Sequence, residues 1–304
     1  MSVRYHVHHR TEYRYGASVQ VARHLLHLAP RDCDWQAVEA RALRVDPDPA
    51  TRVDTIDAFG NPVTLIEFSA AHDHLVVDSE MTVRVVARPW PAGFAAGLAA
   101  GTPWETVRDE LAYRAGPVDA EVCAALAMRF ESPAVRVKRE LELYAAPSFG
   151  AGRSLVSAAA DLMARIHEEF AFDPEATVVG TSVLEVLERK RGVCQDFAHL
   201  MIGCLRATGL AARYVSGYLR TDPPEGEVRL VGADASHAWV AVWIPGLGWV
   251  EFDPTNNCLA DERHLVLGWG RDFGDVSPVR GVIQGGGEHT LEVAVTVTPL
   301  GEYA

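Results

Sequence analysis

Hydrophobic and polar residues alternate along much of the first 90 residues. The runs Val3–His8 and Met81–Val86 carry an apolar residue at every second position, which is the period of a strand with one buried face. Between them, Asp57–Asn61 is rich in turn-forming residues, and Val63–Phe68 is expected to return as the second strand of a hairpin. Short strands separated by turns predict a β-sandwich-like N-terminal domain over residues 1–92.

The apolar period lengthens between about residue 95 and residue 210. Apolar residues recur about every 3.6 positions along Ser154–Phe170, which predicts an amphipathic helix. A second helix is expected to begin at Cys194, because Gly192 interrupts the preceding pattern there, and to end at Gly209.

Strand-like patterns return after residue 211. Arg213–Leu219, His237–Ile244, Trp249–Asp253 and Thr290–Val297 are rich in β-branched and aromatic residues. The fold class is therefore predicted to be α+β, with a second domain over residues 93–304.

Composition and charge exclude several functions. The chain has 304 residues and a net charge of −13, so nucleic acid is not expected as a partner, because binding phosphates requires clustered cations. No run of about 18 apolar residues is present, so no membrane interaction is expected, and the first residues lack the apolar segment of a secretory signal. The five cysteines are scattered and odd in number, which is not a disulfide framework. A cytoplasmic location is expected, and the oligomeric state is left open.

Cys194 is the candidate nucleophile among these cysteines. It stands where a glycine-broken turn enters a helix, and the free N–H groups and positive dipole of a helix N-terminus stabilise a thiolate. The alternative is a small buried apolar residue. Cys204, in the middle of the apolar stripe of the same helix, is interpreted in that second way.

A thiolate nucleophile needs a basic partner, and that partner needs an orienting carboxylate. His237 begins one predicted strand and Asp253 ends the next. The two side chains share a sheet face only if the connecting loop has an odd number of residues or a strand carries a bulge. A regular four-residue loop over Pro245–Gly248 would place them on opposite faces.

Together these motifs resemble those of the transglutaminase-like superfamily, and within it the bacterial proteins with a β-rich N-terminal region. The resemblance covers nearly the whole chain, with a core at about residues 150–257. It is carried by Tyr5–Tyr13, Asp57–Asn61, Phe170–Thr177, Gly192–His199, Gly209–Gly217, His237–Trp239, Phe252–Thr255 and Gly268–Asp275.

The resemblance implies a papain-like catalytic core, in which a helix bearing the cysteine packs on an antiparallel sheet bearing the histidine and aspartate. Cys194 would be the nucleophile, His237 the base and acid, and Asp253 the residue that orients the histidine. The chemistry would be attack on an amide carbonyl to give an acyl-thioester.

Further residues are candidates for supporting roles around this triad. His199 lies about 140° around the helix from Cys194, which favours packing or an indirect hydrogen bond. Gln195 is a candidate oxyanion donor beside the backbone N–H of Cys194, and Trp239 is a candidate wall of the site. The candidate substrate-cleft residues are Arg213, Tyr214 and Ser216.

No cofactor and no metal are expected. His6 and His8 share a strand face, but no cysteine or carboxylate pair accompanies them at ligand spacing.

The predicted function is amide-bond hydrolysis on a peptide or protein substrate, as in a cysteine peptidase or amidase. Transfer of the acyl group to an amine, the transglutaminase reaction, shares the acyl-enzyme and stays open as the alternative. A non-catalytic peptide-binding module is the third possibility.

Overall fold

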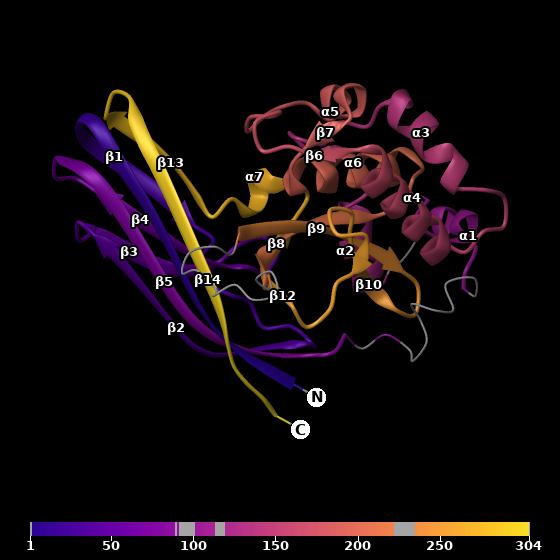
Figure 1. Ribbon diagram of the computed structural model, residues 1–304, viewed down its shortest axis with the longest axis horizontal. Helices are drawn as coiled ribbons and strands as arrows, with labels where there is room; N and C mark the ends of the chain where they lie inside the picture. The colour runs from indigo at the N-terminus through magenta and orange to yellow at the C-terminus, as the bar shows by residue number, and fades with distance from the viewer. Residues whose placement is uncertain (1, 89, 91–100, 113–118, 222–234, 304) are drawn as a thin grey trace, which may run out of the picture.

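The computed structural model describes residues 2–88, 90, 101–112, 119–221 and 235–303, and its fold is α+β (Figure 1). A large antiparallel sheet lies at one side of the molecule, a smaller antiparallel sheet lies in the middle, and the helices lie at the other side. This agrees with the predicted fold class. No helix within the described ranges combines the length and hydropathy needed to cross a bilayer.

The large sheet has seven strands in the order β2-β5-β1-β4-β3, with β13 and β14 also paired to β1. Its strands are β1 (Ser2–Leu26), β2 (Gln36–Asp46), β3 (Thr51–Ile56), β4 (Pro62–Phe68), β5 (His72–Val86), β13 (Val279–Gly285) and β14 (His289–Tyr303). The long strand β1 pairs with β5 along its first half and with β4 along its second half. The apolar side chains of Leu26, Ile66, Phe68 and Leu75 pack into one cluster, so this N-terminal β region encloses a core of its own.

Strands β13 and β14 depart from the expected division of the chain. The expected boundary at residue 92 assigned them to the second domain, whereas they complete the sheet of the N-terminal region. The strand predicted at Thr290–Val297 is present as part of β14, with Val295 and Val297 buried and Leu291 and Val293 exposed. Alternation specifies which side chains are buried but not which strand is the partner. The predicted boundary itself lies outside the described residues.

The second sheet has five strands in the order β11-β10-β9-β8-β12. They are β8 (Ala212–Leu219), β9 (Ala235–Ile244), β10 (Gly248–Asp253), β11 (Cys258–Leu259) and β12 (His264–Gly270). One face packs on the large sheet through Tyr218, Leu265 and Leu267, which join Tyr5 and Val7 in a shared apolar cluster. The N-terminal region is therefore fixed to the second sheet by a common core.

The helices pack against the second sheet through Tyr214, Val240 and Phe252. They are α1 (Trp104–Glu110), α2 (Ala120–Ala127), α3 (Arg139–Ala145), η1 (Ala146–Ser148), α4 (Leu155–Glu169), α5 (Val183–Arg189), α6 (Cys194–Ala207) and α7 (Phe273–Val276), with the short parallel pair β6 (Ala171–Phe172) and β7 (Arg191–Gly192) between them. Helix α6 lies against β8 and β9 and is buried along nearly its whole length. Burial of this helix positions its first residue at the margin of the sheet.

Candidate active site

The start of α6 is shaped by three residues of the Gly-Val-Cys-Gln-Asp motif. Val193 occupies the N-cap position and offers no side-chain cap. The Asp196 side chain holds this turn instead. Its Oδ2 accepts hydrogen bonds from the backbone N–H of Val193 at 2.9 Å and from the hydroxyl of Thr177 at 2.7 Å. A Cβ at residue 192 would lie 2.7 Å from that same oxygen, so only glycine fits. This local arrangement sets Cys194 as the first helical residue.

Cys194 is partly exposed, in contrast to Cys204 on the same helix. Cys204 is fully buried, and burial raises the pKa of its thiol to about 12. The interpretation of Cys204 as an apolar core residue is confirmed, while Cys194 has the access to solvent that a nucleophile requires.

His237 and Asp253 share a face of the second sheet because the loop between their strands has three residues. Ile244 pairs with Gly248 and Val240 with Phe252, so only residues 245–247 lie outside the ladder. Gly246 and Gly248 adopt φ values of 76° and 72°, a conformation that favours glycine. The odd-loop condition stated from the sequence is therefore met.

The His237 ring joins the cysteine to the aspartate. Its Nε2 donates to Asp253 Oδ2 at 2.7 Å, and the ring also hydrogen-bonds Cys194. Burial alone would lower the pKa of His237, but the hydrogen bonds and charges of Asp253 and Cys194 outweigh it and raise that pKa to about 9. The imidazole is therefore held in its protonated form at neutral pH.

Asp253 is fully buried and surrounded by donors. Its Oδ1 accepts the backbone N–H groups of Thr255 at 2.9 Å and Asn256 at 3.2 Å, and its Oδ2 accepts the Asn256 amide at 2.7 Å. Burial alone would raise the pKa of this carboxyl, but the hydrogen bonds from His237 and His264 hold it far below its usual range. The carboxylate is thus ionised and fixed in orientation.

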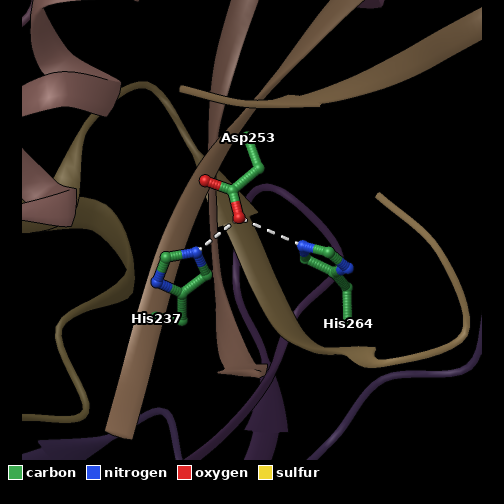
Figure 2. Close-up of side chains that lie close together, drawn as sticks. All are labelled: His237, Asp253 and His264. Carbon is green, nitrogen blue, oxygen red and sulfur yellow. Dashed lines mark hydrogen bonds and ion pairs between the residues drawn. The ribbon is translucent and has the colours of Figure 1, made fainter. Parts of the chain in front are cut away.

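His264 was not anticipated from the sequence. Its Nε2 lies 3.2 Å from Asp253 Oδ2, so two histidines meet the same oxygen atom (Figure 2). His264 begins β12, which is separated from β10 by two strands of the sheet, and no sequence spacing reveals that proximity. Asn256 was also missed, although its place in the turn Asp253-Pro-Thr-Asn256 is typical of an aspartate that caps following backbone N–H groups.

The ligand atoms of His237, Asp253 and His264 all lie within 4.8 Å of one another. Both Nε2 atoms are directed at Asp253 Oδ2 (Figure 2). A metal ion bound by all three atoms would break both hydrogen bonds. The arrangement is therefore best described as a hydrogen-bonded network.

Gln195 and His199 line one cavity of about 420 Å³ beside the start of α6. His199 is buried, and its Nε2 accepts the backbone N–H of Phe273 at 3.1 Å. Burial lowers its pKa to about 4, so the ring is neutral at physiological pH. It supports the segment around α7 and does not contact the thiol through any hydrogen bond in the described part of the chain.

Trp239 lies beneath the histidines and is fully buried. Its ring is stacked beside His237 with a centroid distance of 6.0 Å and meets His264 edge-on at 5.3 Å. It therefore packs the two imidazoles in place.

The three predicted cleft residues do not lie together, because neighbouring residues of a strand point to opposite faces. Tyr214 is buried against His199, with ring centroids 5.1 Å apart. Burial, and then the nearby Cys194 charge, raise its pKa well above the usual range. Ser216 is buried two residues further along. The Arg213 guanidinium instead stacks between two indoles, 3.7 Å from Trp269 and 4.3 Å from Trp249. Arg213 therefore faces the other side of the strand from Tyr214 and Ser216, and a role for any of the three in a substrate cleft stays a prediction.

Comparison with known proteins agrees with this architecture. Residues 5–84 match the bacterial transglutaminase-like N-terminal region, and residues 144–254 match the transglutaminase-like superfamily. An uncharacterized protein of Mycobacterium tuberculosis is 42% identical over 301 residues, covering 97% of this chain and 93% of that protein. The crystal structure of a proposed cysteine protease from Cytophaga hutchinsonii has the same fold, with a TM-score of 0.75 and 17% identity over 100% of this chain and 93% of that one.

A shorter similarity reaches an enzyme with a named activity. A protein-glutamine gamma-glutamyltransferase of Pseudomonas aeruginosa is 36% identical over 100 residues, which are 32% of this chain and 15% of that protein. A papain-like core with an N-terminal β region, and sequence similarity over nearly its full length, place this protein in one class. The chain belongs to the transglutaminase-like superfamily.

Proposed function

We propose that the protein is a cysteine-dependent amide hydrolase that acts on peptide or protein substrates through an acyl-thioester. The observation that carries the proposal is the continuous contact from Cys194 through His237 to a buried, ionised Asp253. A thiol, an imidazole and an orienting carboxylate in this order are the parts that nucleophilic attack on an amide requires.

The reaction follows from the positions of these groups. The Cys194 sulfur attacks the amide carbonyl, and the imidazolium of His237 donates its proton to the leaving amine as the C–N bond breaks. Neutral His237 then takes a proton from water, which attacks the thioester and releases the carboxylic acid and the thiolate. The backbone N–H of Cys194, among the first N–H groups of α6 that lack an acceptor within the helix, is proposed to stabilise the oxyanion.

The cavity lined by Gln195 is proposed to receive a side chain of the substrate. Its apolar lining includes Ala134, Val183 and Phe273, while Arg136 and Lys138 contribute positive charge. An Ala134→Phe variant is expected to raise KM for peptide substrates and to leave alkylation of Cys194 by small reagents unchanged.

Transfer of the acyl group to an amine is the second candidate, and the similarity to the Pseudomonas aeruginosa gamma-glutamyltransferase favours it. Both reactions share the acyl-enzyme and differ in whether water or an amine attacks it.

A cytoplasmic location stays a prediction from the sequence.

The test is turnover of a library of peptide amides by the wild-type protein and by Cys194→Ala, with products identified by mass spectrometry. Release of free acid and amine that depends on Cys194 supports hydrolysis. A new amide formed only when a primary amine is added in excess would replace hydrolysis by transamidation. Equal turnover by the two proteins would exclude both Cys194-dependent reactions, and absence of turnover in both would leave a binding role as the alternative.

A further inference from the structure

His264 is a fully buried histidine that the proposed reaction does not use. Its ring lies on the far side of Asp253 from His237, and the two Nε2 atoms approach the same carboxylate oxygen (Figure 2). The question is whether this second imidazole only fills space or directs the carboxylate.

Both ring nitrogens of His264 have defined partners. Nδ1 lies 3.1 Å from Asp261 Oδ1 and 3.1 Å from the backbone nitrogen of Asp261. The neutral ring accepts from that N–H, whereas the charged ring donates to the carboxylate. In either form Nε2 carries a proton, because Asp253 Oδ2 is an acceptor only. His264 therefore donates to Asp253 whatever its charge.

The position of His264 is fixed from several directions. Its carbonyl oxygen accepts from Arg88 Nη2 at 3.1 Å, and Arg88 is paired with the buried carboxylate of Glu251 at 3.0 Å. The edge of its ring packs on Trp239. A side chain held in this way is a rigid support for whatever it contacts.

The hydrogen bonds around Asp253 are divided between its two oxygens. Backbone N–H groups of Thr255 and Asn256 hold Oδ1. His264 and His237 share Oδ2 with the Asn256 amide. Among the residues that the structure describes, Oδ2 would without His264 keep only the Asn256 amide and His237 itself, which must move its proton during the reaction.

We propose that His264 is a positioning residue: its Nε2–H holds the Asp253 carboxylate in the orientation that presents His237 to Cys194. The inference rests on the proposed function for its consequence in turnover. The effect of His264 on the Cys194–His237 pair, exerted through Asp253, can be measured without any substrate.

Two substitutions separate hydrogen-bond donation from filling space. His264→Gln keeps an N–H near the Nε2 position, and His264→Leu keeps much of the volume without a donor. His264→Leu is expected to lower kcat by about tenfold or more with little change in KM, and His264→Gln to recover most of that loss. Loss of the donor makes Asp253 a stronger acceptor, so the alkaline limb of the kcat profile should move to higher pH in the leucine variant and less far in the glutamine variant, which loses the charge but keeps the donor.

The matched control is His9→Gln. His9 is equally buried, with ring nitrogens 2.7 Å from the Tyr218 hydroxyl and 2.9 Å from Thr11 Oγ1, and it does not contact Asp253. This variant is expected to lose stability without a change in the pH profile. Thermal unfolding of every variant shows whether each is folded. If His264→Leu does not fold, Asp261→Asn is the second route, because it removes the negative charge beside His264 Nδ1 and keeps the imidazole.

Alkylation of Cys194 by iodoacetamide at pH 6 separates this inference from the proposed function. Slower alkylation in His264→Leu, or in Asp261→Asn, than in wild type and His264→Gln supports the positioning role even if no amide is turned over. Alkylation rates that are equal in all folded variants would overturn it, as would equal losses in the glutamine and leucine variants. Absence of turnover in the wild type would overturn the proposed function alone.

Discussion

Gly217 lies directly opposite His237 in the pairing of β8 with β9. A Cβ at this position would collide with the backbone carbonyl of Leu265 and would lie 2.7 Å from the ring of Trp239. The absence of a side chain thus lets β12 and the Trp239 ring approach β8, the strand paired with the one that carries the candidate base.

Gly217→Ala is therefore expected to destabilise the protein by about 2 kcal/mol, because neither a backbone carbonyl nor a buried indole can move aside easily. Displacement of Trp239 from beneath His237 should lower turnover as well. Gly150→Ala is the control, because a Cβ there has no atom within 4 Å. Chemical unfolding that gives equal stabilities for the two variants would contradict the close packing at Gly217.

Asp196→Ala removes the side chain that holds the turn before Cys194. Loss of its hydrogen bond to Val193 is expected to cost about 1 kcal/mol, as for other helix caps. It should also slow alkylation of Cys194. Ser154→Ala, which removes the cap of α4 by taking away its bond to the Ser157 backbone N–H, should cost similar stability without slowing alkylation. Parallel slowing in both variants would show that the effect is not local to α6.

Stability should be greatest near pH 6.5. Burial lowers the pKa of His9, His24 and His199 to about 4, so the unfolded chain takes up protons first and the free energy of unfolding decreases as pH falls from about 6.5 to 4. The pKa values of His237 and His264 are raised to about 9 and about 10. Their stabilisation is complete below about pH 6.5 and is lost as pH rises through those values.

Thermal unfolding between pH 4 and pH 10 measures both arms of this dependence. His199→Gln should flatten the acid arm, and His237→Gln should flatten the alkaline arm. A melting temperature that rises steadily from pH 6.5 to pH 10 would contradict the raised pKa values.

Turnover should decrease above about pH 9. The imidazolium of His237 donates the proton to the leaving amine, and its pKa is raised to about 9, so the acid form is depleted beyond that pH. Measurement of kcat between pH 6 and pH 10.5 tests this. A chemically activated ester substrate, whose leaving group needs no proton, serves as the comparison and should keep its rate. An equal decrease for both substrates would point to loss of the fold.

The helix at Cys194 and the strands at His237 and Asp253 were predictable because local patterns specify them. Gly192 interrupts the preceding apolar pattern, and the apolar stripe after it predicts α6. Positions 237 and 253 are both odd, which requires an odd number of residues in the loop between their strands, or a bulge, if the two side chains share a sheet face. Local patterns do not specify partners distant in sequence. For this reason the pairing of β13 and β14 with β1 and the approach of His264 to Asp253 were not foreseen. The opposite orientations of Arg213 and Tyr214 could be predicted from the sequence, because adjacent strand residues face opposite ways.

The most direct measurement is alkylation of each cysteine by an iodoacetamide probe between pH 4 and pH 9, with the labelled residues mapped by mass spectrometry. Exposed Cys123 is the internal reference. If Cys194 and His237 form a reactive pair, Cys194 is labelled faster than Cys123 below about pH 7, and His237→Ala abolishes the difference. If Cys194 is labelled no faster than Cys123, or if the His237→Ala variant is labelled as fast as wild type, the catalytic pair does not exist.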